Sequence, residues 1–144
     1  MFIIGIVGAL LLFGIAGFHF YWLFGGTVGT DRYVQLDKDG KRIHIGKPLI
    51  LATALVFVVA GLIPFVGLRI VTLPLPDALA DLLTNICLIF GIAVFAIRGC
   101  AGLVWSLMQR KPRDIFHRWN IMLYTPLCVF LAISYGACYV VFGS

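Results

Sequence analysis

The sequence predicts an all-α integral membrane protein, a four-helix transmembrane bundle with a short β-hairpin in its first cytoplasmic loop. Three observations predict this class. Of the 144 residues, 62% are hydrophobic and only 12% are charged, whereas soluble domains carry about a quarter charged residues. The mean hydropathy is +1.07, which also excludes disorder, because disordered chains are poor in apolar residues. Apolar stretches long enough to cross a bilayer occur four times, with charged connections between them.

The first two expected spans belong to a single transmembrane domain that covers residues 1–144. The first span, 2–24, has no basic residue before it and ends in bulky side chains. A signal peptide would start with basic residues and end at a small-residue cleavage site, so we interpret this segment as a retained span. The second span, 48–68, carries no charge and is long enough to cross about 30 Å of hydrocarbon.

The third and fourth expected spans each contain one unusual residue. The third, 82–108, is interrupted by Arg98, its only charge. The fourth, 119–142, contains Pro126. Membrane helices tolerate proline where their neighbours satisfy the carbonyl that it frees.

Basic residues concentrate in the connections 25–47 and 109–118, which lie on the same side of a four-span protein. The opposite side carries Arg69 alone, so the count is nine against one. Because basic loops stay in the cytoplasm, we expect both termini on the outer side of the membrane. The nine residues are Arg32, Lys38, Lys41, Arg42, Lys47, Arg110, Lys111, Arg113 and Arg118.

The first cytoplasmic loop has the pattern of a hairpin. Apolar residues alternate over 33–36 and 41–45, and the sequence Asp-Lys-Asp-Gly at 37–40 separates them. Asp-Gly favours the tight turn that joins two antiparallel strands. The two acids do not predict a calcium site, because the closing Glu of a twelve-residue calcium loop is absent.

Polar residues inside the spans are the candidates for function, because burying them in a membrane is costly. His19 and Thr53 lie near the cytoplasmic ends of the first two spans, and Arg98 lies about ten residues from the cytoplasmic end of the third. Asn120 and Tyr124 begin the fourth span, one helical turn apart on one face. We therefore expect these five side chains to line one polar cavity in the cytoplasmic half of the bundle.

Two interpretations of Arg98 are open at this stage. Its side chain snorkels past Gly99 and Gly102 toward the cytoplasmic headgroups, or it faces the interior and binds an anionic ligand. His19 is similarly either a hydrogen-bonding residue between helices or a ligand contact.

Glycines in the first and third spans predict close contacts between helices, because small residues let membrane helices pack. We expect these two spans to touch. The glycines are Gly5, Gly8, Gly14, Gly17, Gly91, Gly99 and Gly102.

The sequence contains no recognised catalytic motif and no cluster of cysteine and histidine at zinc spacing, so no enzyme activity, metal or cofactor is predicted. A disulfide between Cys87 and Cys138 is an alternative to four free cysteines. Haem would need facing histidines, and His19 and His117 are the candidates.

Three segments together resemble a bacterial family of small four-helix membrane proteins, the domain of unknown function 3995. Residues 17–26 are similar to a G-x-H-x-x-W-x-x-G motif, and residues 96–102 to an arginine-glycine motif. Residues 116–128 resemble F-x-x-x-D…Y-[ST]-P-L-C, with Asn120 where the family usually has Asp. The resemblance implies the four-helix fold in a bacterial inner membrane, with both termini then on the periplasmic side, and it implies no activity. It selects His19, Trp22, Arg98, Asn120, Tyr124 and Pro126.

From these features we expect a protein that binds a small or lipid-like ligand in a polar cavity. Membrane lipids are the expected partners, and nucleic acid is not, because the basic residues flank the spans. One alternative is an accessory subunit of a larger membrane complex, or a homo-oligomer, and a less favoured one is a haem or redox carrier. The expected ligand-binding residues are His19, Trp22, Thr53, Arg98, Asn120 and Tyr124.

Overall fold

The computed structural model describes residues 1–28, 46–108 and 119–143 as an all-helical, multi-pass membrane protein. Four helices are long and apolar enough to cross a membrane, which confirms the prediction of a four-helix protein. That the whole chain forms one domain stays a prediction. The helices are α1 (Phe2–Leu23), α3 (Lys47–Gly67), α4 (Asp77–Met108) and α6 (Thr125–Gly143), and α6 directly follows the π-helix η1 (Asn120–Tyr124).

The fold class needs one correction, because the part of the chain that the structure describes is all-helical and shows no β-hairpin. The described ranges contain helices and turns but no strand. The segment with the alternating pattern, 33–45, lies outside the described residues. Alternation over four or five residues is a weak signal, since an isolated two-stranded hairpin is at best marginally stable in water.

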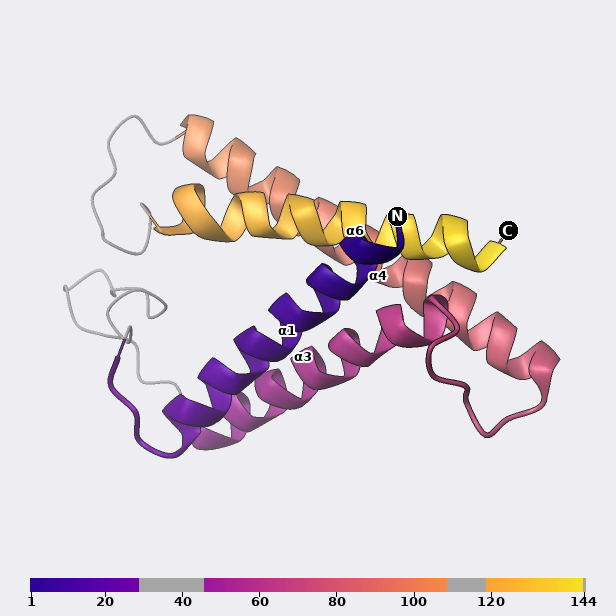
Figure 1. Cartoon of the computed structure of the whole chain (residues 1–144). Helices are drawn as coiled ribbons and strands as arrows, with labels where there is room; N and C mark the ends of the chain where they lie inside the picture. Colours follow the sequence, from indigo (N-terminus) through magenta and orange to yellow (C-terminus); the bar gives the residue numbers. More distant parts are fainter. Residues whose placement is uncertain (29–45, 109–118, 144) are drawn as a thin grey trace.

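The helices form two antiparallel pairs, α1 with α3 and α4 with α6. The pairs meet at the end of the molecule that holds both termini (Figure 1). Toward the opposite end, where α1 and α4 finish, the two pairs diverge (Figure 1). The residues that the sequence assigns to the cytoplasmic half therefore lie on two separating pairs of helices.

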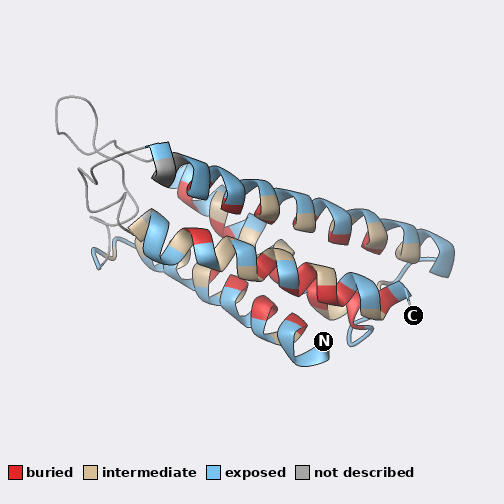
Figure 2. Ribbon diagram, turned by 90° about the horizontal axis from the view of Figure 1, so that it is seen from above, coloured by how far each residue is buried: buried red, intermediate tan, exposed pale blue. Residues whose placement is uncertain are grey.

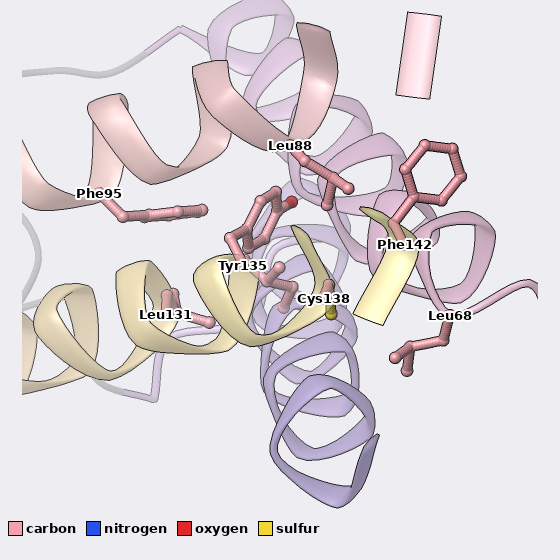
Figure 3. Packing of buried hydrophobic residues seen from close by; sticks show 8 residues of the cluster. Leu68, Leu88, Phe95, Leu131, Tyr135, Cys138 and Phe142 are labelled. Atoms are coloured by element: carbon pink, nitrogen blue, oxygen red, sulfur yellow. The ribbon is translucent and has the colours of Figure 1, made fainter. Parts of the chain in front are cut away.

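The buried core lies where the pairs meet, and α6 supplies half of it. Tyr135 of α6 is 1% exposed and donates its hydroxyl to the carbonyl of Ala60 on α3, at 2.5 Å. Its ring also packs against Phe95 of α4, with 5.4 Å between ring centroids. The cluster, drawn in Figure 3, consists of Leu12, Leu68, Leu88, Phe95, Leu131, Tyr135, Cys138 and Phe142. Buried positions follow one face of each helix (Figure 2).

Glycines on α1 and α4 receive side chains of α6, while a contact between the first and third spans stays a prediction. Gly8 of α1 faces Ser134, whose hydroxyl donates to the carbonyl of Ile4 at 3.1 Å. Gly91 of α4 faces the ring of Tyr135. Both glycines allow the close approach that packs membrane helices, but the helix that approaches them is the fourth span.

Arg69 ties three helices together at the terminal end. It has a positive φ of 56° directly after α3, and the amide of Ile70 returns to the carbonyl of Phe65 at 2.9 Å. This bond is typical of a helix end whose next residue is left-handed, usually a glycine. The guanidinium lies 3.7 Å from the carboxylate of Asp81 on α4 and 4.7 Å from the ring centroid of Phe142 on α6.

Candidate functional site

The six predicted site residues divide between the two helix pairs. Three lie on the first pair and three on the second, and the two pairs diverge toward one end of the molecule (Figure 1). The side chain of Asn120 lies outside the described residues, and the common cavity stays a prediction. The first group is His19, Trp22 and Thr53, and the second is Arg98, Asn120 and Tyr124.

His19 is an aromatic contact between α1 and α3. Its Nδ1 donates to the carbonyl of Ile15 at 2.8 Å, because a carbonyl only accepts. Its half-buried ring lies 5.1 Å from the ring centroid of Trp22 and 5.3 Å from that of Phe57 on α3. With Nδ1 as the donor, Nε2 is the nitrogen with the lone pair.

Trp22 and Thr53 make local hydrogen bonds within the first pair. The indole of Trp22 donates to the carbonyl of Val28 at 2.9 Å, directly after the end of α1. The hydroxyl of Thr53 donates to the carbonyl of Leu49 at 2.8 Å. Both side chains therefore have a structural role that is sufficient by itself to explain their positions.

Arg98 runs along α4 toward the end with the basic connections. Its Nη1 lies 3.3 Å from the position that a Cβ would take at Gly102, four residues later. Helical side chains usually lean toward the N-terminus of their helix, so this direction is the one expected of a snorkelling arginine. The backbone of α4 next to Arg98 is packed against α6, because the neighbouring residue Gly99 faces Cys128 and Val129.

The guanidinium of Arg98 therefore lies beside α6, nearer to the C-terminal end of α4 than the Cα of Arg98 is. The notch at Gly102 holds the hydroxyl of Thr125, which lies even closer to the missing Cβ than Nη1 does. Arg98 as a whole is exposed and not buried inside the bundle, so its direction fits the snorkelling interpretation, while its end lies beside a polar atom of α6.

Thr125 was not among the residues predicted from the sequence. It is 2% exposed, and its hydroxyl is the buried side-chain oxygen that lacks a hydrogen-bond partner in the described part of the chain. The hydroxyls of Thr53 and Thr84 instead bond to the carbonyl four residues earlier, at 2.8 and 2.7 Å. The sequence did contain one signal for Thr125, because this residue occupies the [ST] position of the Y-[ST]-P motif, where the motif requires a hydroxyl.

The π-helix η1 explains why the hydroxyl of Thr125 differs from those of the other two threonines. Pro126 lacks an amide hydrogen, and its ring would clash in an α-helix with the carbonyl of Met122. The chain forms a wider π turn over Asn120–Tyr124, immediately before Thr125. The carbonyl to which a helical threonine usually bonds belongs to this turn. Single π turns within helices are frequent at functional sites.

Arg98, Thr125 and Gly102 combine a cation, a buried hydroxyl and a glycine that makes room for this hydroxyl. Such a group can bind a negatively charged oxygen atom, since hydrogen bonds with an ionised partner are stronger than neutral ones. No group of three or more metal-binding side chains occurs in the described ranges. Cys87 and Cys138 are both free cysteines, so the structure contains no disulfide between them. His117, the second candidate for haem, lies outside the described residues.

Comparison with known proteins identifies one family. The model of the family described as "Protein of unknown function (DUF3995)" matches residues 12–135. This range includes all six predicted site residues as well as Gly102 and Thr125. No curated protein and no solved structure matches the chain.

Proposed function

The chain belongs to the DUF3995 family of proteins of unknown function, and from this premise we propose that it binds a small or lipid-like ligand within the membrane. The proposed site lies in the half of the bundle where the basic connections meet the helices. The ligand contacts are Arg98 and Thr125 on the second helix pair, with Asn120 and Tyr124 from η1. A ligand larger than a single ion would also reach His19, Trp22 and Thr53 on the first pair.

One observation carries this proposal: the hydroxyl of Thr125 is buried without a partner directly beside the guanidinium of Arg98. A buried polar group without a hydrogen bond costs about 1–3 kcal/mol. Retaining it at a π turn, next to a cation inside a membrane span, is the pattern of a binding site rather than of packing. A ligand that accepts a hydrogen bond would remove this cost.

The orientation in the membrane is part of the proposal. We propose that both termini face the periplasm of a bacterial inner membrane and that the two basic connections are cytoplasmic. The nine-to-one distribution of basic residues supports this orientation. Both termini lie toward the same end of the bundle in Figure 1, which supports a common side for them. Reporter fusions active only in the periplasm should therefore be active at either terminus.

Native mass spectrometry of the protein, purified gently from its own membranes, tests the binding function. We expect an additional small mass on the wild-type chain and its loss in Arg98→Ala. The matched control is Arg69→Ala, which removes a cation at the opposite end of the bundle and should keep the mass. Size-exclusion chromatography verifies that both variants are folded.

The alternative outcomes are informative. An unliganded wild-type chain, or an Arg98→Ala variant that keeps the additional mass, would contradict the proposal. A second polypeptide at a fixed stoichiometry would instead support the accessory-subunit alternative.

A further inference from the structure

We propose that Arg98 and Thr125 form an oxyanion site across the contact of α4 and α6, and that the ligand presents a phosphate-type or carboxylate-type group to it. This inference rests on the proposed ligand-binding function and names the chemistry of that ligand. Two features of the described residues support it, namely an unused hydroxyl and a cation beside it.

The hydroxyl of Thr125 is available as a donor. Its oxygen makes no hydrogen bond although the residue is 2% exposed. Thr84 provides the comparison, since it is 4% exposed and its hydroxyl is bonded to the carbonyl of Ala80 at 2.7 Å. An oxyanion is a pure acceptor and suits a hydroxyl that has its hydrogen to donate.

The cation lies at the same point. Nη1 of Arg98 is 3.3 Å from the missing Cβ of Gly102, and Oγ1 of Thr125 is nearer still. Two donors that flank one point can contact a single oxygen or two oxygens of one group. Guanidinium is the side chain best matched to phosphate and carboxylate, because it presents a planar fork of donors. After Asp81, α4 carries no carboxylate that would repel such a group, and α6 carries none at all.

Gly102 makes room for the hydroxyl of Thr125 between the two helices. A Cβ at this position would collide with Oγ1 of Thr125 and would also lie 3.3 Å from its Cβ. The hydroxyl would have to rotate or the helices would have to separate. Alanine at this position should therefore impair the site without changing any polar group.

The depth of the site favours an amphiphile. Thr125 lies five residues after the start of η1, which is about 7 Å along a helix, so an oxyanion there is just below the membrane surface. Deeper on the same two helices, Ile97 is 69% and Val129 is 39% exposed. An anionic lipid would place its headgroup on Arg98 and Thr125 and its chain along these apolar residues. A free phosphate ion offers the same oxyanion chemistry without the chain.

Binding to the full-length protein in a neutral detergent separates these sources. The probes are dioleoyl phosphatidic acid, dioleoyl phosphatidylcholine and inorganic phosphate, each titrated and measured by native mass spectrometry. We expect one equivalent of phosphatidic acid to bind at least tenfold more tightly than phosphatidylcholine, because the zwitterionic headgroup carries its own cation. Tight binding of phosphate, with displacement of the lipid, would identify the free ion as the source.

Thr125→Val is the decisive variant, because valine has the shape of threonine without the hydroxyl. We expect phosphatidic acid to bind about 3- to 10-fold more weakly, the effect of one hydrogen bond in a membrane protein. Gly102→Ala should weaken binding similarly, and Arg98→Gln by more than tenfold. The matched control Thr84→Val changes a buried threonine of α4 outside the site and should stay within twofold of the wild type.

A thermal unfolding measurement distinguishes loss of the site from loss of folding. Without ligand, Thr125→Val should unfold at the wild-type temperature or above it, because the change removes an unpaired buried hydroxyl. Weaker binding by a chain that is no less stable supports the oxyanion site.

Two results would overturn it. One is wild-type affinity of Thr125→Val for phosphatidic acid, and the other is equal affinity of the wild type for both lipids. If Arg98→Ala still loses the native ligand in either case, the proposed function stands and only the oxyanion chemistry fails.

Discussion

Gly8 is the position at which the addition of one methyl group should be most informative about the packing of the bundle. The Cβ of an alanine there would lie 2.7 Å from Cβ of Ser134 and would collide with its hydroxyl. Cβ of Ser134 is fixed to the backbone of α6, so a change of rotamer cannot remove the contact. Gly8→Ala should therefore push α1 and α6 apart.

The expected magnitude follows from three contributions. Overpacking costs about 1–3 kcal/mol, and the hydrogen bond from Ser134 to the carbonyl of Ile4 contributes about 0.5–1.5 kcal/mol. Replacing glycine by alanine inside a helix gains about 1 kcal/mol. The net effect should be a destabilisation of about 1–3 kcal/mol. The matched control is Gly14→Ala on the same helix, where nothing lies within 4 Å of the added methyl group, so only the gain of up to about 1 kcal/mol remains.

The assay is unfolding of each full-length variant in mixed micelles by increasing sodium dodecyl sulfate, followed by circular dichroism. Gly8→Ala should unfold at a lower detergent fraction than the wild type, and Gly14→Ala at an equal or higher fraction. Adding Ser134→Ala to Gly8→Ala should restore stability only in part, because Cβ of residue 134 remains in contact. Equal stability of Gly8→Ala and Gly14→Ala would refute the close approach of α1 and α6.

Two further predictions concern the terminal end of the bundle. Tyr135→Phe removes the hydrogen bond to Ala60 and should lower the free energy of unfolding by about 0.5–1.5 kcal/mol; an unchanged detergent midpoint would contradict that bond. Arg69→Ala should cost about 1 kcal/mol, since the ion pair with Asp81 is exposed and the contact with Phe142 is weak. Arg69→Gly loses the same contacts but relieves the positive φ, so it should be about 1 kcal/mol more stable than Arg69→Ala. Equal stability of these two variants would show that the left-handed backbone carries no strain.

The candidate site was predicted in part, and the missing part has a physical reason. Depth along a span follows from residue number at 1.5 Å per residue, so the sequence correctly grouped His19 and Arg98 in one half of the bundle. Which helix each residue faces depends on the pairing of helices. Since α1 pairs with α3 and α4 with α6, these two residues lie on different pairs.

Thr125 shows a different limit of sequence reasoning. A threonine in an apolar segment normally bonds to its own helix, as Thr53 does, so its presence there attracts no attention. It became a site residue because the π turn before it and the glycine opposite it leave its hydroxyl buried without a partner. Neither the π turn nor the facing glycine can be recognised from the sequence of one helix alone.

By itself, the sequence determined that the described part of this chain has four segments long and apolar enough to cross a membrane, because this property depends on the length and hydropathy of each segment alone. Only the tertiary structure decided that α6 is the central helix, that glycines of α1 and α4 both face it, and that Arg98 ends beside Thr125. Contacts between membrane helices gain little from hydrophobicity, since lipid is equally apolar. They depend on which side chain fits which notch, and that complementarity exists only between helices that are already side by side.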